Sequence, residues 1–385
     1  MREVAVIGIG QTKVQENWDK SLRDLAGEAV LAALEDSNFT QIEGVFVGNM
    51  MSASANHQQH LGAYISDWVG TRFIQAIRLE SACSSGASAF RAAVMAVASG
   101  TINSAIAVGV EKMSDSPINE ITNSLATAAD ADWEVTQGLS FVAINALIMQ
   151  RYLHEYHWKH SDFANFSINS HKNAMNNPFA RFHMLITQEQ YAKSGMVADP
   201  INLLDASPTG DGAAAAVLVP VENLNTSANR NIITVAGSAA ATDTISVQNR
   251  KDPLWLKAAE ISSKKAYSQA AIQPQNIDFF EYHDAFTIMA ALSLEACGFA
   301  ERGLGPKLAV DGEIRLEGKI PTATMGGLKA RGHPVGATGM YQIIELVEQL
   351  RGQSGENQIS GARIGMAQNI GGSGSNIITH ILRTL

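Results

Sequence analysis

The chain has 385 residues, of which 46% are hydrophobic and 17% charged, and its formal net charge is −9 at pH 7. This length exceeds one ordinary core and favours two packed halves, while an acidic balance without Lys and Arg clusters argues against nucleic acid as a partner. No apolar run reaches the roughly 18 residues of a membrane span, and the N-terminus lacks the apolar core of a signal peptide, so we expect a cytoplasmic protein without a membrane span.

The N-terminal part alternates between strand and helix patterns. Apolar residues recur at helical spacing over 22–34 and again after Cys83. Short apolar runs flank these segments, at residues 4–9, 44–48, 72–80 and 104–110. This alternation predicts an α/β fold in which helices cover a parallel or mixed sheet.

Residues 113–212 lose the strand rhythm. They contain clusters of Asn, Asp, Thr and Ser and a helical pattern over 141–156. Long irregular segments in compact proteins are usually lids or binding loops. We therefore interpret 113–212 as an inserted region that covers the substrate, with a purely structural role as the alternative.

The rest of the chain repeats the order of its beginning. A strand pattern starts near Asn231, a helical pattern covers 253–271, and a further strand pattern covers 277–282. Such a repeat of elements indicates an internal duplication. We place the two halves at residues 1–228 and 229–385.

The duplication also relates two residues that could carry chemistry. Cys83 and His333 are each followed by Gly-Ala three residues later and then by an apolar helical pattern. We therefore expect two helices to begin at these residues and to bring a thiol and an imidazole together.

Cys83 stands at a turn between a strand pattern and a helical pattern, in Glu-Ser-Ala-Cys-Ser-Ser-Gly. A helix start carries partial positive charge and favours the thiolate, and the small neighbours permit a tight turn. An inert core cysteine is the alternative, and we assign that role to Cys297. Because the chain has only these two cysteines and no Cys-x-x-Cys pair, we predict neither a disulfide framework nor a metal site.

His333 lies between glycines in Arg-Gly-His-Pro-Val-Gly-Ala-Thr-Gly, and Pro334 suits a first helical turn. A neutral imidazole there could take the proton of Cys83 and return it to a leaving thiolate. The alternative is a glycine-rich turn in which the histidine only packs.

Two further turns follow strand patterns in the second half. His283, in His-Asp-Ala-Phe, ends the 277–282 pattern, where α/β sheets place their sites, and could donate a hydrogen bond to an oxygen that becomes negative. Asn369 begins Asn-Ile-Gly-Gly-Ser-Gly, whose amides could line the same pocket. Turn formation alone explains this last motif equally well.

Together these motifs resemble the thiolase superfamily over nearly the whole chain. The Cys83 turn resembles the family's acylated nucleophile. His-Asp-Ala-Phe, with His171 in Ser-Ile-Asn-Ser-His-Lys-Asn-Ala, is closer to the sterol-carrier-protein-type thiolases and their archaeal relatives. The residues that match the family's histidine signature and last catalytic loop are Gly332, His333, Gly336, Asn369, Gly371 and Gly372.

The resemblance implies a fold of five layers, α-β-α-β-α, built from two thiolase-like halves, and a homodimer or dimer of dimers. It also implies coenzyme A thioesters as substrates, with coenzyme A itself as a substrate and no other cofactor. By position, Cys83 accepts the acyl group, His333 activates it, and His283 and His333 polarise the second thioester. The amides of Cys83 and Gly371 form the other oxyanion hole.

One departure from the family concerns the base. Biosynthetic thiolases remove the α-proton of acetyl-CoA with a second cysteine, and the two positions where it occurs are Asn369 and Ala285 here. Without a positioned base, formation of the carbon–carbon bond is slow. Our hypothesis is that His283 takes the α-proton.

Two alternatives to a thiolase-type acyltransferase remain open. A Cys-His-His set also resembles decarboxylating ketosynthases, which need no such base. The missing second cysteine is also compatible with a weakly active subunit that holds coenzyme A thioesters for a partner. Archaeal relatives imply a possible complex with a condensing synthase and a small protein with a zinc ribbon and an OB-fold.

Overall fold

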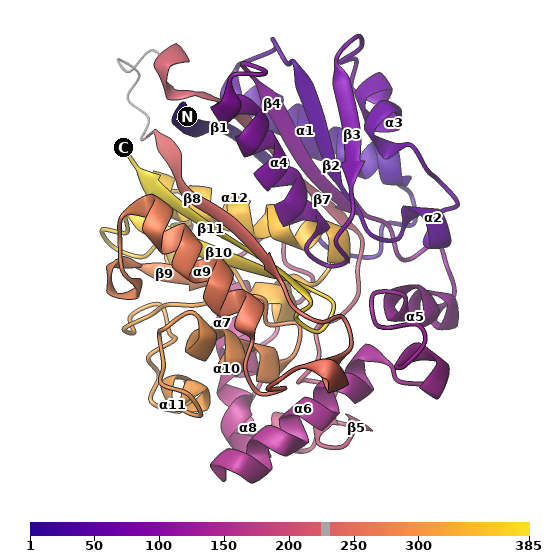
Figure 1. Ribbon diagram of the computed structural model, residues 1–385, viewed down its shortest axis with the longest axis vertical. Coiled ribbons are helices and arrows are strands. Elements are labelled where there is room, and N and C mark those ends of the chain that lie inside the picture. The colour runs from indigo at the N-terminus through magenta and orange to yellow at the C-terminus, as the bar shows by residue number, and fades with distance from the viewer. Residues whose placement is uncertain (225–231) are drawn as a thin grey trace.

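The computed structural model describes residues 1–224 and 232–385, so the predicted boundary at 228/229 and the strand start near Asn231 lie outside the described residues. Its main sheet runs β3-β2-β4-β7-β1-β8-β11-β10-β9 (Figure 1). The strands are β1 (Val4–Gln11), β2 (Gly44–Gly48), β3 (Gln75–Leu79), β4 (Ala105–Glu111), β7 (Gly212–Pro220), β8 (Ile233–Thr242), β9 (Phe279–Glu281), β10 (Ile364–Gly371) and β11 (Asn376–Thr384). A separate hairpin pairs β5 (Met196–Ala198) with β6 (Ile201–Asn202).

The described helices lie either in the two repeated halves or in the region 113–212. Those of the halves are α1 (Leu22–Ser37), α2 (Ser52–Ala55), α3 (Leu61–Trp68), α4 (Ser85–Ser99), α9 (Lys257–Ala270), α10 (Thr287–Ala296), α11 (Gly305–Val310) and α12 (Thr338–Arg351). Those of the region 113–212 are α5 (Ile118–Ala126), α6 (Phe141–Tyr156), α7 (Ala164–Ala174) and α8 (Gln188–Ala192). Within the described ranges, no helix is long and apolar enough to cross a bilayer.

The two halves meet at a short joint in the middle of the sheet. Strand β1 pairs with β8 through only two residue pairs, Ala5 with Thr234 and Val6 with Ile233. On the N-terminal side β1 continues to β7, β4, β2 and β3, and on the C-terminal side β8 continues to β11, β10 and β9. Figure 1 shows these two groups of strands on opposite sides of α4 and α12.

Helices α4 and α12 form the middle layer of the protein. They pack on each other, α4 also on β2 and β4, and α12 on β7 and β10. One apolar cluster joins them to Leu218 of the N-terminal strands and to Leu382 of the C-terminal strands. Because α1 covers the outer face of the first group and α9 that of the second, the layers run α-β-α-β-α, which confirms the predicted fold.

The pairing pattern confirms the duplication. The first and last strands of each half, β1 with β7 and β8 with β11, are antiparallel, whereas β2 with β4 and β9 with β10 are parallel. The counterpart of β3 is reduced to one isolated parallel bridge between Phe280 and Thr322. The copies therefore share one topology but differ at one edge.

The region 113–212 is more helical than its composition suggested. Helix α7 carries the Ser- and Asn-rich segment, yet it is largely buried. The Nδ2 groups of Asn169, Asn173 and Asn177 donate to the backbone carbonyls of residues 314–325, with distances of 2.8–3.5 Å. Buried polar side chains are tolerated when they are paired in this way, so a polar helix can pack inside the fold.

Candidate active site

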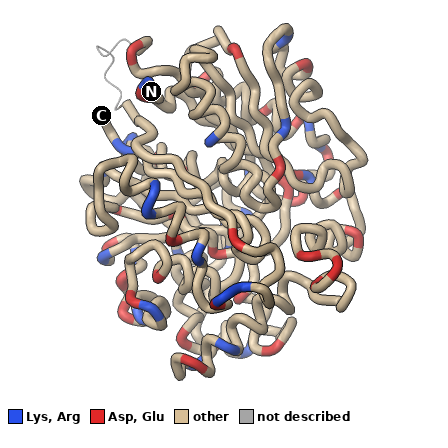
Figure 2. Tube along the Cα trace, viewed as in Figure 1, with Lys and Arg blue, Asp and Glu red and all other residues tan. Residues whose placement is uncertain are grey.

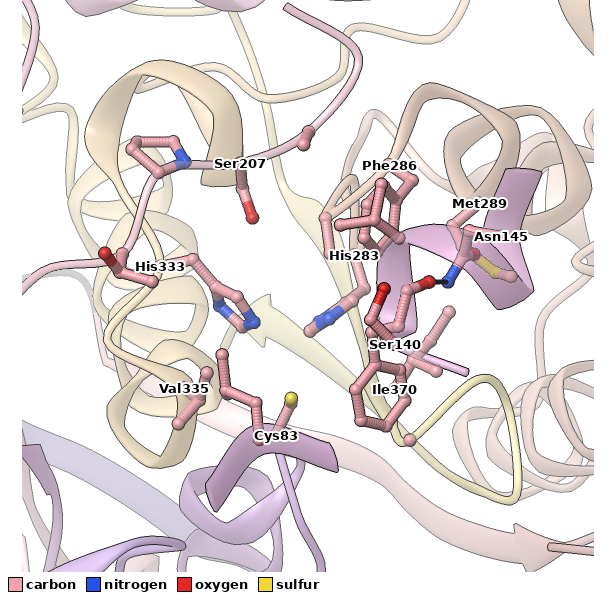
Figure 3. Close-up of a pocket in the computed structure, with 18 of the residues that line it drawn as sticks. Cys83, Ser140, Asn145, Ser207, His283, Phe286, Met289, His333, Val335 and Ile370 are labelled. Carbon is pink, nitrogen blue, oxygen red and sulfur yellow. Dashed lines mark hydrogen bonds between the residues drawn. The ribbon is translucent and has the colours of Figure 1, made fainter. Parts of the chain in front are cut away.

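A cavity of about 240 Å³ lies between the turn that precedes α4, the turn that precedes α12 and the inserted helices (Figure 3). Its wall is mainly apolar, which excludes water from the polar groups that face it. The polar side chains among its lining are Cys83, Thr122, Ser140, Asn145, Ser207, Thr209, His283 and His333. In Figure 3 the sulfur of Cys83 and the rings of both histidines point into the same space.

A strained turn presents Cys83 to the cavity. Ala82 adopts a left-handed backbone conformation, with φ of 53°, which side chains with a Cβ rarely take. The hydroxyls of Ser84 and Ser85 donate to the carbonyls of Ser81 and Ala82, both at 2.6 Å, and hold the turn. Helix α4 begins at Ser85, two residues after the predicted start.

The Cys83 thiol is neutral at rest, contrary to the expectation of a thiolate. Burial raises its pKa to about 12, and the nearby Glu111 carboxylate raises it further. The backbone N–H groups of Cys83 and Gly372 act in the opposite direction but are outweighed. The cost of burying a charge outweighs the partial positive charge of the helix start that favoured the thiolate. The nucleophile therefore needs a base.

Glu111, which the sequence analysis did not identify, joins the two halves behind the cavity. Its carboxylate accepts hydrogen bonds from the amides of Met50 and Met51 at 3.0 Å, from the amide of Gly336 at 2.9 Å and from Nδ2 of Asn49 at 2.9 Å. Burial raises the pKa of Glu111 to about 7 despite these donors. No local motif marks this residue, because its partners lie 60 to 225 positions away.

His333 is buried with an imidazole that is neutral at neutral pH. Burial lowers its pKa well below the usual value, and the nearby His283, Arg331 and Lys329 lower it further. Its Nδ1 lies 2.6 Å from the Thr338 hydroxyl, which donates to the carbonyl of Pro334 at 3.3 Å. The hydroxyl thus accepts from Nδ1–H, and Nε2 is the nitrogen without a proton.

His283 faces His333 edge-on, with their ring centroids 5.1 Å apart. Burial, and then the charge of Arg331, lower its pKa to about 3, so this ring is also neutral. Its Nδ1 lies 3.0 Å from Nδ2 of Asn369, which also contacts Oε1 of Gln342 at 2.9 Å. Gln342 is a second residue that the sequence analysis missed, since it lies in a helix without a motif of its own.

The predicted glycines serve the site in different ways. Gly372 lines the cavity, and its amide is the one that reaches the Cys83 sulfur. Gly371 lies behind it, where a Cβ would come within 2.3 Å of the Ser81 carbonyl. A Cβ on Gly336 would come within 2.4 Å of the Glu111 carboxylate, so this glycine permits close packing of the two turns.

Two further predicted residues, like Gly336, Asn369 and Gly371, lie outside the cavity lining. The Nδ1 of His171 is 3.0 Å from the carbonyl of Met184, and its ring stacks on Phe182. Gly332, with φ of 107°, faces Val14. Cys297 is buried, as expected of a core residue. Among the described residues, no group of three or more His, Cys, Asp or Glu side chains is arranged to hold a metal ion.

Charged groups are dispersed over both halves. Figure 2 shows Lys and Arg interspersed with Asp and Glu along the described chain, without a dense basic patch in this view. The cavity itself contains no Lys, Arg, Asp or Glu among its lining residues. The chemistry available at its surface is therefore that of one thiol, two neutral imidazoles, hydroxyls and backbone amides.

Comparisons with known proteins match this arrangement. The family model described as "Thiolase, N-terminal domain" matches residues 4–222, and the one described as "Thiolase C-terminal domain-like" matches residues 239–384. The acetyl-CoA acetyltransferase of Methanothermobacter thermautotrophicus is 43% identical, with 99% of each chain covered. Sterol carrier protein 2 of Bos taurus is 29% identical, with 98% of this chain and 71% of the relative covered.

Solved structures share the fold over the whole chain. The Ltp2-ChsH2(DUF35) aldolase has a TM-score of 0.85 at 23% identity, covering 99% of this chain and 98% of that chain. The Acat5 thiolase from Ascaris suum, in complex with coenzyme A, has a TM-score of 0.74 at 19% identity, with both chains fully covered. The two family models together span nearly all of the described residues, and the chain belongs to the thiolase family of acyltransferases.

Proposed function

We propose that this chain transfers acyl groups between coenzyme A thioesters through a thioester on Cys83. The supporting observation is that one thiol and two neutral imidazoles face a single apolar cavity. The proposal covers both directions: condensation of an acyl-CoA with acetyl-CoA, and thiolysis of a 3-oxoacyl-CoA.

In the first half-reaction, Nε2 of His333 takes the proton of the Cys83 thiol. The sulfur attacks the carbonyl carbon of the thioester, the bond from that carbon to the sulfur of coenzyme A breaks, and His333 returns the proton to the leaving thiolate. The amides of Cys83 and Gly372, which already face the sulfur, are placed to stabilise the oxyanion. This replaces Gly371 with Gly372 as the proposed second donor.

The decisive experiment is acylation by acetyl-CoA alone. Intact-protein mass spectrometry should find one acetyl group, peptide mapping should place it on Cys83, and Cys83→Ala should carry none. Thiolysis of acetoacetyl-CoA and of longer 3-oxoacyl-CoAs should be lost in the same variant. An unmodified wild-type Cys83 would reject the proposal and favour a subunit that only holds thioesters, whereas turnover that requires malonyl-CoA would favour a decarboxylating ketosynthase.

We further propose that two copies of the chain associate along β3. This strand is the last in the sheet order, so one of its edges has no partner among the described strands, and Ile77 in it is 47% exposed. Unpaired edges readily add a strand from another chain. Analytical ultracentrifugation tests this dimer.

Three expectations stay predictions. The cytoplasmic location and the complex with a condensing synthase and a zinc-ribbon and OB-fold protein require fractionation and co-purification from the native source. The role of His171 in substrate binding requires a KM measurement on His171→Ala. If KM for acyl-CoA is unchanged in that variant, the assignment of His171 is withdrawn.

A further inference from the structure

We infer that Gln342 and Asn369 lock His283 in the tautomer that donates from Nε2, which leaves His333 as the base for both half-reactions. This inference rests on the proposed function and deepens it. It also replaces the hypothesis that His283 removes the α-proton. Asn369 and Gln342 are positioning residues, because they act on substrate only through His283.

Three backbone carbonyl groups fix the orientation of the Gln342 amide. Its Nε2 lies 3.1, 2.9 and 3.0 Å from the backbone carbonyl oxygens of Glu281, Tyr282 and Gln368. Carbonyl oxygens only accept hydrogen bonds, so the atom among them must be the amide nitrogen. The Oε1 of Gln342 therefore faces Asn369.

The orientation of Asn369 follows from that of Gln342. The atom of Asn369 that lies 2.9 Å from Oε1 of Gln342 must be a donor, which makes it Nδ2. A reversed amide would set two carbonyl oxygens against each other in a buried site. The second hydrogen of the same Nδ2 points to Nδ1 of His283, at 3.0 Å.

The tautomer of His283 follows from the orientation of Asn369. Its Nδ1 accepts from Asn369, and the ring is neutral because burial and Arg331 lower its pKa to about 3. The single ring proton is thus on Nε2. A ring in this state can donate to an oxyanion, but neither of its nitrogens can take the α-proton, because Nδ1 accepts from Asn369 and Nε2 already carries the proton.

The α-proton then has one acceptor among the imidazoles. After the first half-reaction His333 is neutral again, with Nε2 free. The C–H bond of the second thioester breaks, its proton moves to His333, and its electron pair attacks the acyl carbon on Cys83 while the enolate oxygen accepts from Nε2–H of His283. The bond from the acyl carbon to Cys83 breaks, and the released thiolate regains the proton from His333.

The first test reads the tautomer directly, without substrate. NMR of protein labelled with 15N-histidine distinguishes bare from protonated ring nitrogens, and the signals of His283 are assigned by their loss in His283→Asn. We expect a bare Nδ1 and a protonated Nε2 in the wild type. In Asn369→Asp the carboxylate accepts from the ring, so the proton should move to Nδ1. A wild-type His283 with its proton on Nδ1 would overturn the inference.

Two variants separate this effect from simple loss of stability. Asn369→Ala removes the donor without burying a charge and should give a mixture of both tautomers. Asn357→Asp is the matched control, because Asn357 is also a buried Asn that donates from Nδ2, at 2.7 and 2.9 Å, but to backbone carbonyls of Asn173 and Thr324. The signals of His283 should be unchanged in that control.

The second test compares the half-reactions. Loss of one oxyanion donor costs roughly 10²–10³-fold in kcat, so Asn369→Asp should lose this much condensation and α-proton exchange in acetyl-CoA. Acetylation of Cys83 should persist, because backbone amides serve that step. Equal loss of both half-reactions would refute the assignment. Failure of the wild type to acetylate Cys83 would instead reject the proposed function, while the NMR result would still stand.

Discussion

The crossing of α4 and α12 makes Gly339→Ala a sharp test of how the site is assembled. Gly339 lies in the first turn of α12, where a Cβ would come within 2.4 Å of the backbone nitrogen of Ala87 in α4 and within 2.8 Å of Oδ1 of Asn369. Ordinary contact begins at 3.4 Å. The two helices must therefore separate by about 1 Å, because the first obstacle is backbone that cannot rotate away.

The size of the effect follows from this displacement. Overpacking of a core costs about 1–3 kcal/mol, and the better helix propensity of Ala offsets about 1 kcal/mol of this. The protein should remain folded with a free energy of unfolding lowered by up to about 2 kcal/mol. Activity should suffer far more, since a misplacement of about 1 Å can cost ~10²-fold in rate and the turns before these helices carry Cys83 and His333.

Two assays test this prediction: acetoacetyl-CoA thiolysis measures kcat, and urea unfolding measures the free energy of unfolding. The matched control is Gly195→Ala, because a Cβ on Gly195 meets nothing within 4 Å and this glycine has no positive φ. The control should keep both kcat and stability. A Gly339→Ala protein with wild-type kcat would show that the spacing of the two helices does not set the geometry of the site, and the reasoning would fail.

Three further predictions concern the thiol, a partly buried carboxyl and the free sheet edge. Because burial raises the pKa of Cys83 to about 12, its alkylation by iodoacetamide should still accelerate with pH beyond the usual pKa of a thiol, and a plateau near pH 9 would contradict this. Burial raises the pKa of Glu348 from 4.5 to about 7, so its contribution to stability is full below pH 4.5 and is lost as the pH rises through 7. In urea titrations between these pH values, Glu348→Gln should remove up to about 3 kcal/mol of the decline in the free energy of unfolding. If the free energy of unfolding fell equally steeply with pH in the variant, this prediction would be wrong. Ile77→Lys in β3 should shift the protein toward monomer in sedimentation, whereas an unaltered dimer would place the interface elsewhere.

Local patterns were sufficient for the elements that alternate along the chain. The run at 44–48 is β2, the pattern at 141–156 is α6, and the pattern at 253–271 contains α9. Periodicity found these because each buries one face against a neighbouring layer. It could not find α7 as a buried helix, since the Asn side chains there are paired with carbonyls far along the chain.

The residues of the site also fall into those that local sequence patterns indicate and those that they do not. Cys83 and His333 stood out because each lies in a turn rich in small residues before a helical pattern, and His283 because it ends a strand pattern. Glu111 and Gln342 did not, because their roles depend on partners that only the folded chain brings near. The protonation state of Cys83 was also beyond the sequence, since the cost of burying its charge depends on the whole surrounding cavity.

The equivalence of the two turns limits what an ancestor of half this length could have done. Two identical copies would have placed the same side chain at both positions, two sulfurs or two rings, and neither pair combines a nucleophile with its base. Only after the gene had been duplicated could each position mutate independently of the other. The different roles of the two turns, one on each side of the β1–β8 pairing, thus arose when the two copies became different in sequence.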